Sequence, residues 1–86
     1  MAREDKKQSL DEVFFQEKVS VIAEKLKKLR IEKGHKSYET FAWEHNIGRM
    51  QYWKMEKGAT NFTIKSLLRI LKVHDLSLAD FFSDIE

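Results

Sequence analysis

The chain has 86 residues, a formal net charge of +2, no cysteine and no proline. This length suits one small domain with a modest core, and the lack of cysteine excludes disulfides and thiolate metal sites. No apolar run approaches the roughly 20 residues of a membrane-spanning helix. The charged start MAREDKKQ leads into no signal-type apolar segment. We expect a soluble, cytoplasmic protein.

Charge is distributed unevenly along the chain. Residues 18–72 hold thirteen Lys and Arg against five Asp and Glu, whereas residues 73–86 hold four acidic residues and no Lys or Arg. A basic body with an acidic tail suits a polyanionic partner on one face. A solvated surface of mixed charge has the same composition, so charge alone leaves both interpretations open.

The first helix is expected to begin near Ser9. Residues 1–8 are polar and charged, so we expect them to be frayed. The sequence SLDE at 9–12 has the form of a capping box, and nothing breaks a helix from there to Lys33. Around residues 16–20 the apolar spacing is interrupted, which allows a bend. Gly34 is a natural helix stop.

Residues 37–58, SYETFAWEHNIGRMQYWKMEKG, form the most informative stretch. Ser37 is a good N-cap for a second helix over 38–45. Asn46 tolerates the left-handed conformation that closes such a helix, and a third helix over 49–57 ends at Gly58. Two short helices joined by a tight turn commonly place the second in the major groove of DNA.

Two further helices are expected after this stretch. Thr63 caps a fourth helix with the apolar stripe Ile64, Leu67, Leu68 and Leu71, and Ser77 caps a short fifth helix with Leu78, Phe81 and Phe82. The sequence shows no strand-like alternation and no internal repeat. It therefore predicts a compact all-α, five-helix domain over residues 19–86. An N-terminal extension over 1–18 begins frayed and then becomes helical.

Over about residues 22–82 the chain resembles the helix-turn-helix family of phage lambda-type repressors, Cro proteins and xenobiotic-response-element regulators. The resemblance rests on four segments in order: LKKLRIEKG at 26–34, SYETFA at 37–42, NIGRMQYWKMEKG at 46–58 and SLLRILKVHDLSLADFF at 66–82. It implies a lambda repressor-like fold in which the third helix recognises DNA. Tyr38 and Phe41 replace the family's usual Gln and Leu, which affects the base code more than the fold.

The resemblance also implies an ion pair between Arg30 on the first helix and Glu56 at the end of the third. Such a pair would fix the angle of the recognition helix. It is expected to set geometry more than to add stability. The alternative is two unrelated exposed charges.

The outward face of the third helix is expected to contact DNA, because Tyr52 and Met55 should point inward. Arginine can bind guanine and glutamine can bind adenine through two hydrogen bonds each. The expected contacts to base edges come from Arg49, Met50, Gln51, Trp53 and Lys54. Expected contacts to phosphates come from Ser37, Tyr38, Lys57, Thr60 and Asn61. A solvated helix face is the alternative, with Met50 and Trp53 folding back onto neighbours such as Phe62.

Other chemistry is weakly supported by the sequence. His35, His45 and His74 show no metal-ligand spacing, and no catalytic triad order, phosphate-binding loop or carboxylate pair stands out. We expect no enzyme activity, no metal and no cofactor.

Three aromatic residues, Phe14, Phe15 and Trp43, are not explained by the helix-turn-helix interpretation. One hypothesis is that the extension folds against the bundle, or against a second subunit, and buries these rings. They are therefore candidates for contact with a protein partner.

The leading interpretation is a sequence-specific DNA-binding transcriptional regulator that inserts helix 49–57 into the major groove of double-stranded DNA, acting as a homodimer. One alternative is the antitoxin of a toxin–antitoxin pair. Another is a protein-interaction module that has lost DNA binding. The lack of acidic residues on the outward face of the third helix argues against this last interpretation.

Overall fold

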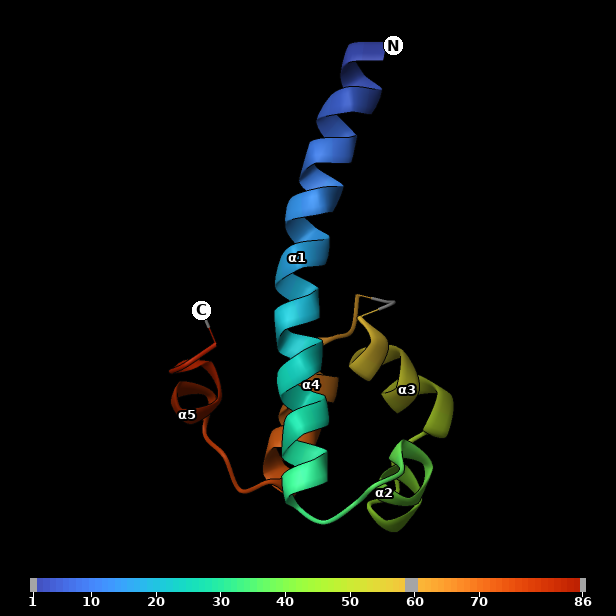
Figure 1. Cartoon of the computed structure of the whole chain (residues 1–86), viewed down its shortest axis with the longest axis vertical. Coiled ribbons are helices and arrows are strands. Elements are labelled where there is room, and N and C mark those ends of the chain that lie inside the picture. Colours follow the sequence, from blue (N-terminus) through green and yellow to red (C-terminus); the bar gives the residue numbers. More distant parts are fainter. Residues whose placement is uncertain (1, 59–60, 86) are drawn as a thin grey trace.

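The computed structural model describes residues 2–58 and 61–85, with side chains from residue 10 onward. Within these residues the chain forms five helices (Figure 1), which are α1 (Ala2–Glu32), α2 (Tyr38–Glu44), α3 (Arg49–Lys57), α4 (Ile64–Val73) and α5 (Leu78–Phe82). No strand occurs in the described ranges. The predicted all-α, five-helix architecture is confirmed.

The first helix is longer and straighter than the sequence suggested. α1 is continuous from Ala2 to Glu32 and includes the start that was expected to be frayed. The prediction of a cap at Ser9 was wrong, and the interrupted apolar spacing around residues 16–20 does not break the helix. Gln16 Nε2 donates to Ser20 Oγ at 3.3 Å, one helical turn away, so these polar residues pair on the helix surface without breaking it.

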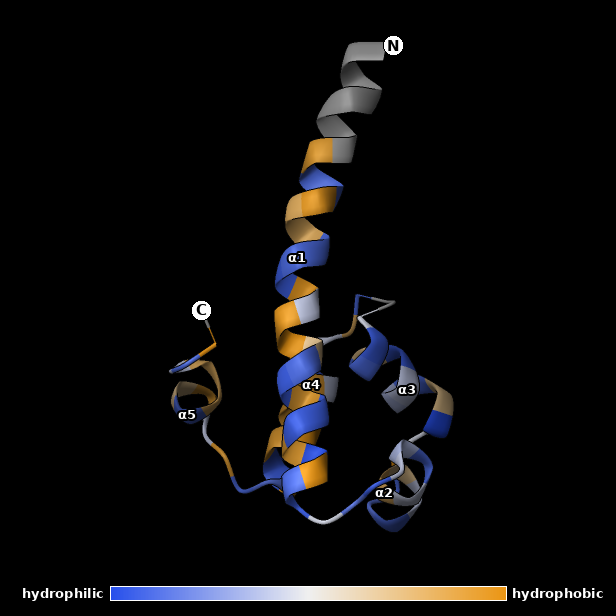
Figure 2. Ribbon diagram, viewed as in Figure 1, coloured by the Kyte–Doolittle hydropathy of each residue, from blue (hydrophilic) through white to orange (hydrophobic). Residues whose placement is uncertain are grey.

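The N-terminal part of α1 extends beyond the other helices (Figure 1). Burial along α1 begins at Val19 and continues at Ala23, Leu26 and Arg30, with helical spacing. Figure 2 shows apolar residues on the projecting part as well. Because α1 is continuous, nothing in its backbone marks the expected boundary between residues 18 and 19, which stays a prediction. No helix in the described ranges is long and apolar enough to cross a bilayer.

The turn between α2 and α3 brings these helices into close contact. Ser37 Oγ caps α2 by accepting hydrogen bonds from two backbone N–H groups. Asn46 takes the left-handed conformation at φ 56°, and buried Ile47 donates its backbone N–H to Ala42 O at 2.8 Å. α2 ends one residue earlier than expected, because His45 is already its C-cap. The methyl side chain of Ala42 is fully buried at this corner.

The end of α3 is held against α1 through Gly58. This residue closes α3 in the left-handed conformation at φ 64°, and its carbonyl oxygen accepts a hydrogen bond of 2.9 Å from Gln16 Nε2. A Cβ at this position would meet α1 side chains only at ordinary contact distance. The backbone conformation, more than lack of space, therefore favours glycine here.

The fourth and fifth helices bury fewer apolar residues than the predicted stripes contained. Leu67, Ile70 and Leu71 of α4 and Phe81 of α5 are buried. The exposed members of the predicted stripes are Ile64, Leu68, Leu78 and Phe82. Leu68 is about 100° around the helix from Leu67, so it points away from the core. The short α5 can direct only one large ring inward.

The core joins all five helices and surrounds one phenylalanine with histidines. Phe41 is fully buried, and its ring centroid lies 5.4 Å from His35, 4.7 Å from His45 and 5.4 Å from His74. The Nε2 atoms of His45 and His74 are buried without a hydrogen-bond partner. Burial lowers the pKa of His74 to about 4 and also lowers the pKa of His45, and the positive charge of Lys33 adds to both effects.

These histidines predict a loss of stability in mild acid. Each of them binds a proton less readily in the folded state than in the unfolded chain, which protonates both as the pH falls through about 6.5. The unfolded state therefore binds more protons between that pH and about 4, and the free energy of unfolding falls as the pH drops through this window. The midpoint of urea unfolding should be lower at pH 5 than at pH 7. This decrease should shrink in the variant His74→Gln. An equal decrease in both proteins would contradict the assignment.

Candidate nucleic-acid interface

The outward face of α3 is basic and exposed. Tyr52 and Met55 are buried in the core, which turns the opposite side of the helix to solvent. That side carries Arg49, Met50, Lys54 and Lys57, all exposed, and Trp53, which is partly buried. The only acidic residue of α3 is Glu56, and its side chain is turned inward. A helix face of this kind can approach the phosphates and base edges of DNA.

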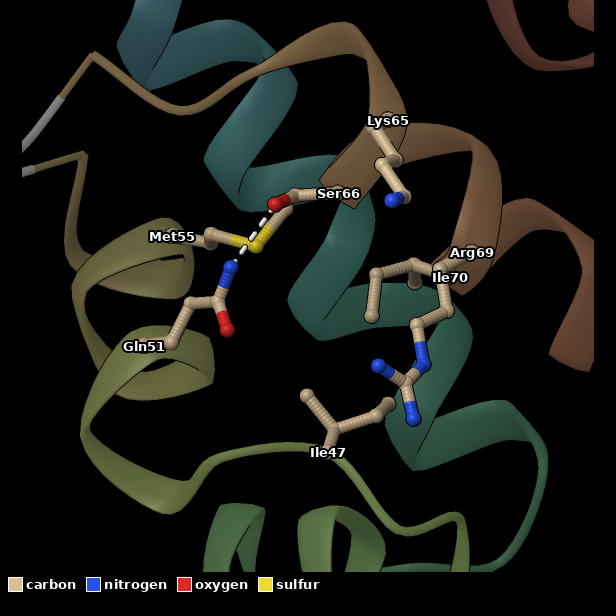
Figure 3. Close-up of a pocket in the computed structure, with 7 residues that line it drawn as sticks. All are labelled: Ile47, Gln51, Met55, Lys65, Ser66, Arg69 and Ile70. Carbon is tan, nitrogen blue, oxygen red and sulfur yellow. Dashed lines mark hydrogen bonds between the residues drawn. The ribbon is translucent and has the colours of Figure 1, made fainter.

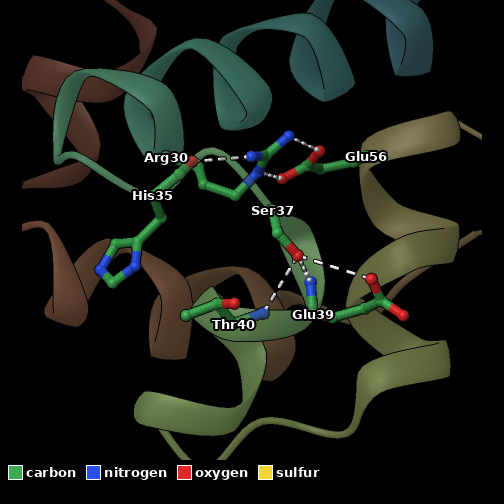
Figure 4. Close-up of polar contacts among 6 residues, drawn as sticks. All are labelled: Arg30, His35, Ser37, Glu39, Thr40 and Glu56. Atoms are coloured by element: carbon green, nitrogen blue, oxygen red, sulfur yellow. Dashed lines mark hydrogen bonds and ion pairs between the residues drawn. The ribbon is translucent and has the colours of Figure 1, made fainter.

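A buried ion pair fixes α3 against α1 (Figure 4). Arg30 Nε donates to Glu56 Oε2 at 2.7 Å, and Arg30 Nη2 donates to Glu56 Oε1 at 3.1 Å. Both side chains are only 6% exposed. Arg30 Nη1 also donates to the carbonyl oxygen of His35 at 2.8 Å. The structure thus brings together the two charges that the resemblance paired, and links them to the connection that leads into α2.

The guanidinium of Arg30 is stabilised in its ionised form. The hydrogen bonds to Glu56 raise the pKa of Arg30, so the guanidinium stays protonated. Burial raises the pKa of the neighbouring Tyr52 hydroxyl, and the charge of Glu56 raises it further. A bidentate contact between a planar guanidinium and a carboxylate fixes both distance and orientation.

Arg49 lies at the start of α3 beside an acidic residue of α2. Its Nη1 is 3.9 Å from Glu39 Oε2, and the two side chains are 64% and 56% exposed. Among the five predicted base contacts, Arg49 is the residue that the structure places next to α2. Its guanidinium stays accessible to a ligand on the outward face.

Gln51 is oriented toward α4 instead of outward (Figure 3). Its Nε2 donates to Ser66 Oγ at 2.7 Å, and Ser66 Oγ also accepts from Thr63 Oγ1 at 3.1 Å. Gln51 and Ser66 line a cavity of about 180 Å³ between α3 and α4. A contact from Gln51 to adenine would require this hydrogen bond to break.

The residues predicted to contact phosphates lie before α3 in the chain, at its end and after it. The hydroxyl of Ser37 already caps α2 and donates to Glu39 Oε1 at 3.5 Å. Tyr38 is partly buried against the core. Lys57 and Asn61 are exposed, and Asn61 lines a shallow depression together with Lys54. Thr60 lies outside the described residues.

Three residues near α3 were not singled out as site residues from the sequence. These residues are Glu39 of α2 and Ser66 and Arg69 of α4. Arg69 Nη2 donates to the carbonyl oxygen of Asn46 at 2.5 Å, which ties α4 to the turn before α3. No sequence signal identifies these contacts, because they depend on how the helices cross.

The aromatic residues of the proposed partner surface are exposed and do not form one cluster. Phe14 is 62% and Trp43 83% exposed, and Phe15 is also exposed. The hypothesis that the extension folds against the bundle and buries these rings was wrong, whereas burial against a second subunit stays a prediction. Figure 1 shows α2, which carries Trp43, beside the C-terminal end of α1 and away from its projecting part. In the described residues, no group of three or more His, Asp or Glu is placed to hold a metal ion.

Known proteins are similar to this chain in sequence and in fold. No protein-family model matches it. The control protein C.MunI of Mycoplasma sp is 40% identical over 62 residues, which are 72% of this chain and 84% of that protein. Two crystal structures of the restriction–modification controller protein C.Esp1396I are 34% identical, with a TM-score of 0.68 over 79% of this chain. One is a tyrosine-to-phenylalanine mutant, of which 85% is covered. The other is a tetramer in complex with its natural 35 base-pair operator, with 88% of its chain covered.

The buried ion pair predicts a large effect of a small substitution. Glu56→Gln removes the carboxylate and leaves the charge of Arg30 buried without its partner. This should lower the free energy of unfolding by about 3 kcal/mol, measured by urea titration. The double variant Arg30→Met/Glu56→Met leaves no unpaired charge and should be more stable than Glu56→Gln. If Glu56→Gln unfolds at the same urea concentration as the unmodified chain, the pair does not stabilise the position of α3.

Proposed function

Because this chain belongs to the family of restriction–modification control proteins, we propose that it is a sequence-specific DNA-binding transcriptional regulator. It inserts α3 into the major groove of an operator and thereby controls transcription, with the genes of a restriction–modification system as its target. The observation that carries this proposal is the basic, outward face of α3, held by the Arg30–Glu56 pair, in a fold shared with an operator-bound controller protein.

The proposed contacts follow from the geometry of that face. Arg49 and Lys54 are exposed cations that can reach guanine edges, and Met50 and Trp53 supply apolar contacts to thymine methyl groups or sugars. Lys57 and Asn61 lie toward the end of α3, where they can contact phosphates and set the register of the helix. Ser37 and Tyr38 stay candidates for phosphate contacts, although the hydroxyl of Ser37 would have to turn away from Glu39.

The two alternative interpretations receive less support. The relatives are named as control or controller proteins, names that denote regulators. A protein-interaction module would not need the cations on the face of α3. We further infer that the family shares its fold with the lambda-type repressors that the sequence resembles. A regulator of this kind works where the genome lies, in agreement with the expected cytoplasmic location.

The exposed apolar residues of α4 and α5 support self-association. Leu68 and Leu78 line one depression between the two helices, and Phe82 follows Leu78 by one helical turn. These three residues form the α4–α5 apolar surface. We infer that it joins two copies into a homodimer, whose twofold symmetry would match an inverted repeat in the operator. The C.Esp1396I assembly on its operator is a tetramer, which two such dimers on one site would produce.

Selection from a random duplex pool at near-physiological salt tests the proposed function. An enriched inverted repeat is expected. Arg49→Ala should weaken binding to that duplex by about 1–3 kcal/mol and should weaken binding to unrelated DNA much less, because it removes a base contact. Lys28→Ala is the matched control, since it removes one positive charge from α1 away from α3. Failure to enrich any sequence, or equal effects of both variants on the enriched duplex, would contradict the proposal.

Sedimentation equilibrium tests the proposed dimer. Leu78→Glu places a charge within the α4–α5 apolar surface and should convert the protein to monomers. Leu10→Glu makes the same change at an exposed position on the projecting part of α1 and should leave the dimer intact. A dimer that persists with Leu78→Glu, or one that is lost only with Leu10→Glu, would show that the interface lies elsewhere.

A further inference from the structure

We propose that Glu39 is a specificity-determining positioning residue of the DNA interface. It holds the guanidinium of Arg49 in position to contact one base, and it disfavours complexes in which that contact is not made. This inference rests on the proposed function, because it concerns how the same face of α2 and α3 distinguishes one DNA sequence from another.

Glu39 is oriented by the cap of α2 (Figure 4). Ser37 Oγ accepts hydrogen bonds from the backbone N–H groups of Glu39 at 3.1 Å and Thr40 at 3.3 Å. The single hydrogen of the same hydroxyl is directed to Glu39 Oε1 at 3.5 Å. One carboxylate oxygen therefore faces Ser37, and the other, Oε2, faces Nη1 of Arg49 at 3.9 Å. A chain of polar contacts runs from the start of α2 to the start of α3.

This arrangement leaves one edge of the Arg49 guanidinium available. Arginine has five N–H donors in a planar fork, and Glu39 faces only Nη1. The Nε and Nη2 donors can therefore form the bidentate contact to guanine O6 and N7. Arg49 is also the first residue of α3, and the N-terminal residues of a recognition helix are those that contact base edges.

The attraction between Glu39 and Arg49 becomes stronger when DNA covers the pair. In the free protein the pair is more than half exposed, and such pairs contribute little. In the complex, water is displaced and the attraction between Glu39 and Arg49 becomes stronger. The carboxylate also repels the nearby phosphates of any DNA. Glu39 thus lowers affinity for DNA in general, and this loss is offset only where Arg49 contacts its base.

Arg49 differs in this respect from the other exposed cations of α3. Within the part of the chain that the structure describes, neither Lys54 nor Lys57 forms an ion pair. These lysines are free to follow phosphates on any sequence. Glu39, by contrast, competes with phosphates for the guanidinium of Arg49 and keeps it near the base edges.

The test compares Glu39→Gln with the matched variant Glu44→Gln. Both substitutions remove one negative charge from α2 and keep the side-chain size, but Glu44 faces His35 and not Arg49. Dissociation constants are measured at one salt concentration for the duplex that the unmodified chain enriches and for an unrelated duplex. The ratio of the two constants is the specificity. The same measurements are made with Arg49→Ala and with Arg49→Ala/Glu39→Gln.

Glu39→Gln should strengthen binding to unrelated DNA and reduce the specificity by about fivefold or more, the lower end of the discrimination that one bidentate base contact provides. Glu44→Gln should leave the specificity unchanged. In the Arg49→Ala background, Glu39→Gln should no longer change it. The inference is overturned if Glu39→Gln keeps the specificity of the unmodified chain, or if its effect persists without Arg49. Specific binding by the unmodified chain in the same assay would show that the proposed function itself stands.

Discussion

The buried ion pair between Arg30 and Glu56 is the contact on which the position of α3 depends. Nine residues are too few for a helix to be stable alone, so α3 needs its neighbours. Packing of Tyr52 and Met55 holds it to the core, but apolar burial has no preferred direction. The bidentate pair fixes the orientation of α3, because both carboxylate oxygens accept hydrogen bonds from Arg30. A third hydrogen bond, from Arg30 to the carbonyl oxygen of His35, ties the same guanidinium to the connection before α2.

With α3 fixed in this way, its outward face is flanked by two polar contacts to neighbouring helices. Arg49 lies beside Glu39 of α2, and Gln51 donates to Ser66 of α4. Within the described residues, the exposed Lys54 and Lys57 form no such contact and can adapt to a groove. The face therefore combines polar side chains that are held by neighbouring helices with exposed cations, which suits a surface that both binds phosphates and distinguishes bases.

Local sequence signals predicted the helices of this chain well, but they could not predict the contacts between helices. The caps at Ser37 and Thr63 and the stop at Gly58 act within a few residues, so the sequence reveals them. The Arg30–Glu56 pair came only from the family resemblance. The contact between Gln51 and Ser66 depends on how α3 crosses α4, which no local pattern encodes. Periodicity placed apolar residues along α4 and α5, but it cannot show which of them a neighbouring helix covers.

The central claim is that the face of α3 presented by the buried ion pair is the surface that contacts DNA. The most direct measurement is amide chemical-shift mapping by NMR on adding the duplex that the protein enriches. The largest changes are expected along α3 and at the start of α2, with little change in the projecting part of α1. Changes concentrated on that projecting part or on α5, with α3 unaffected, would contradict the account.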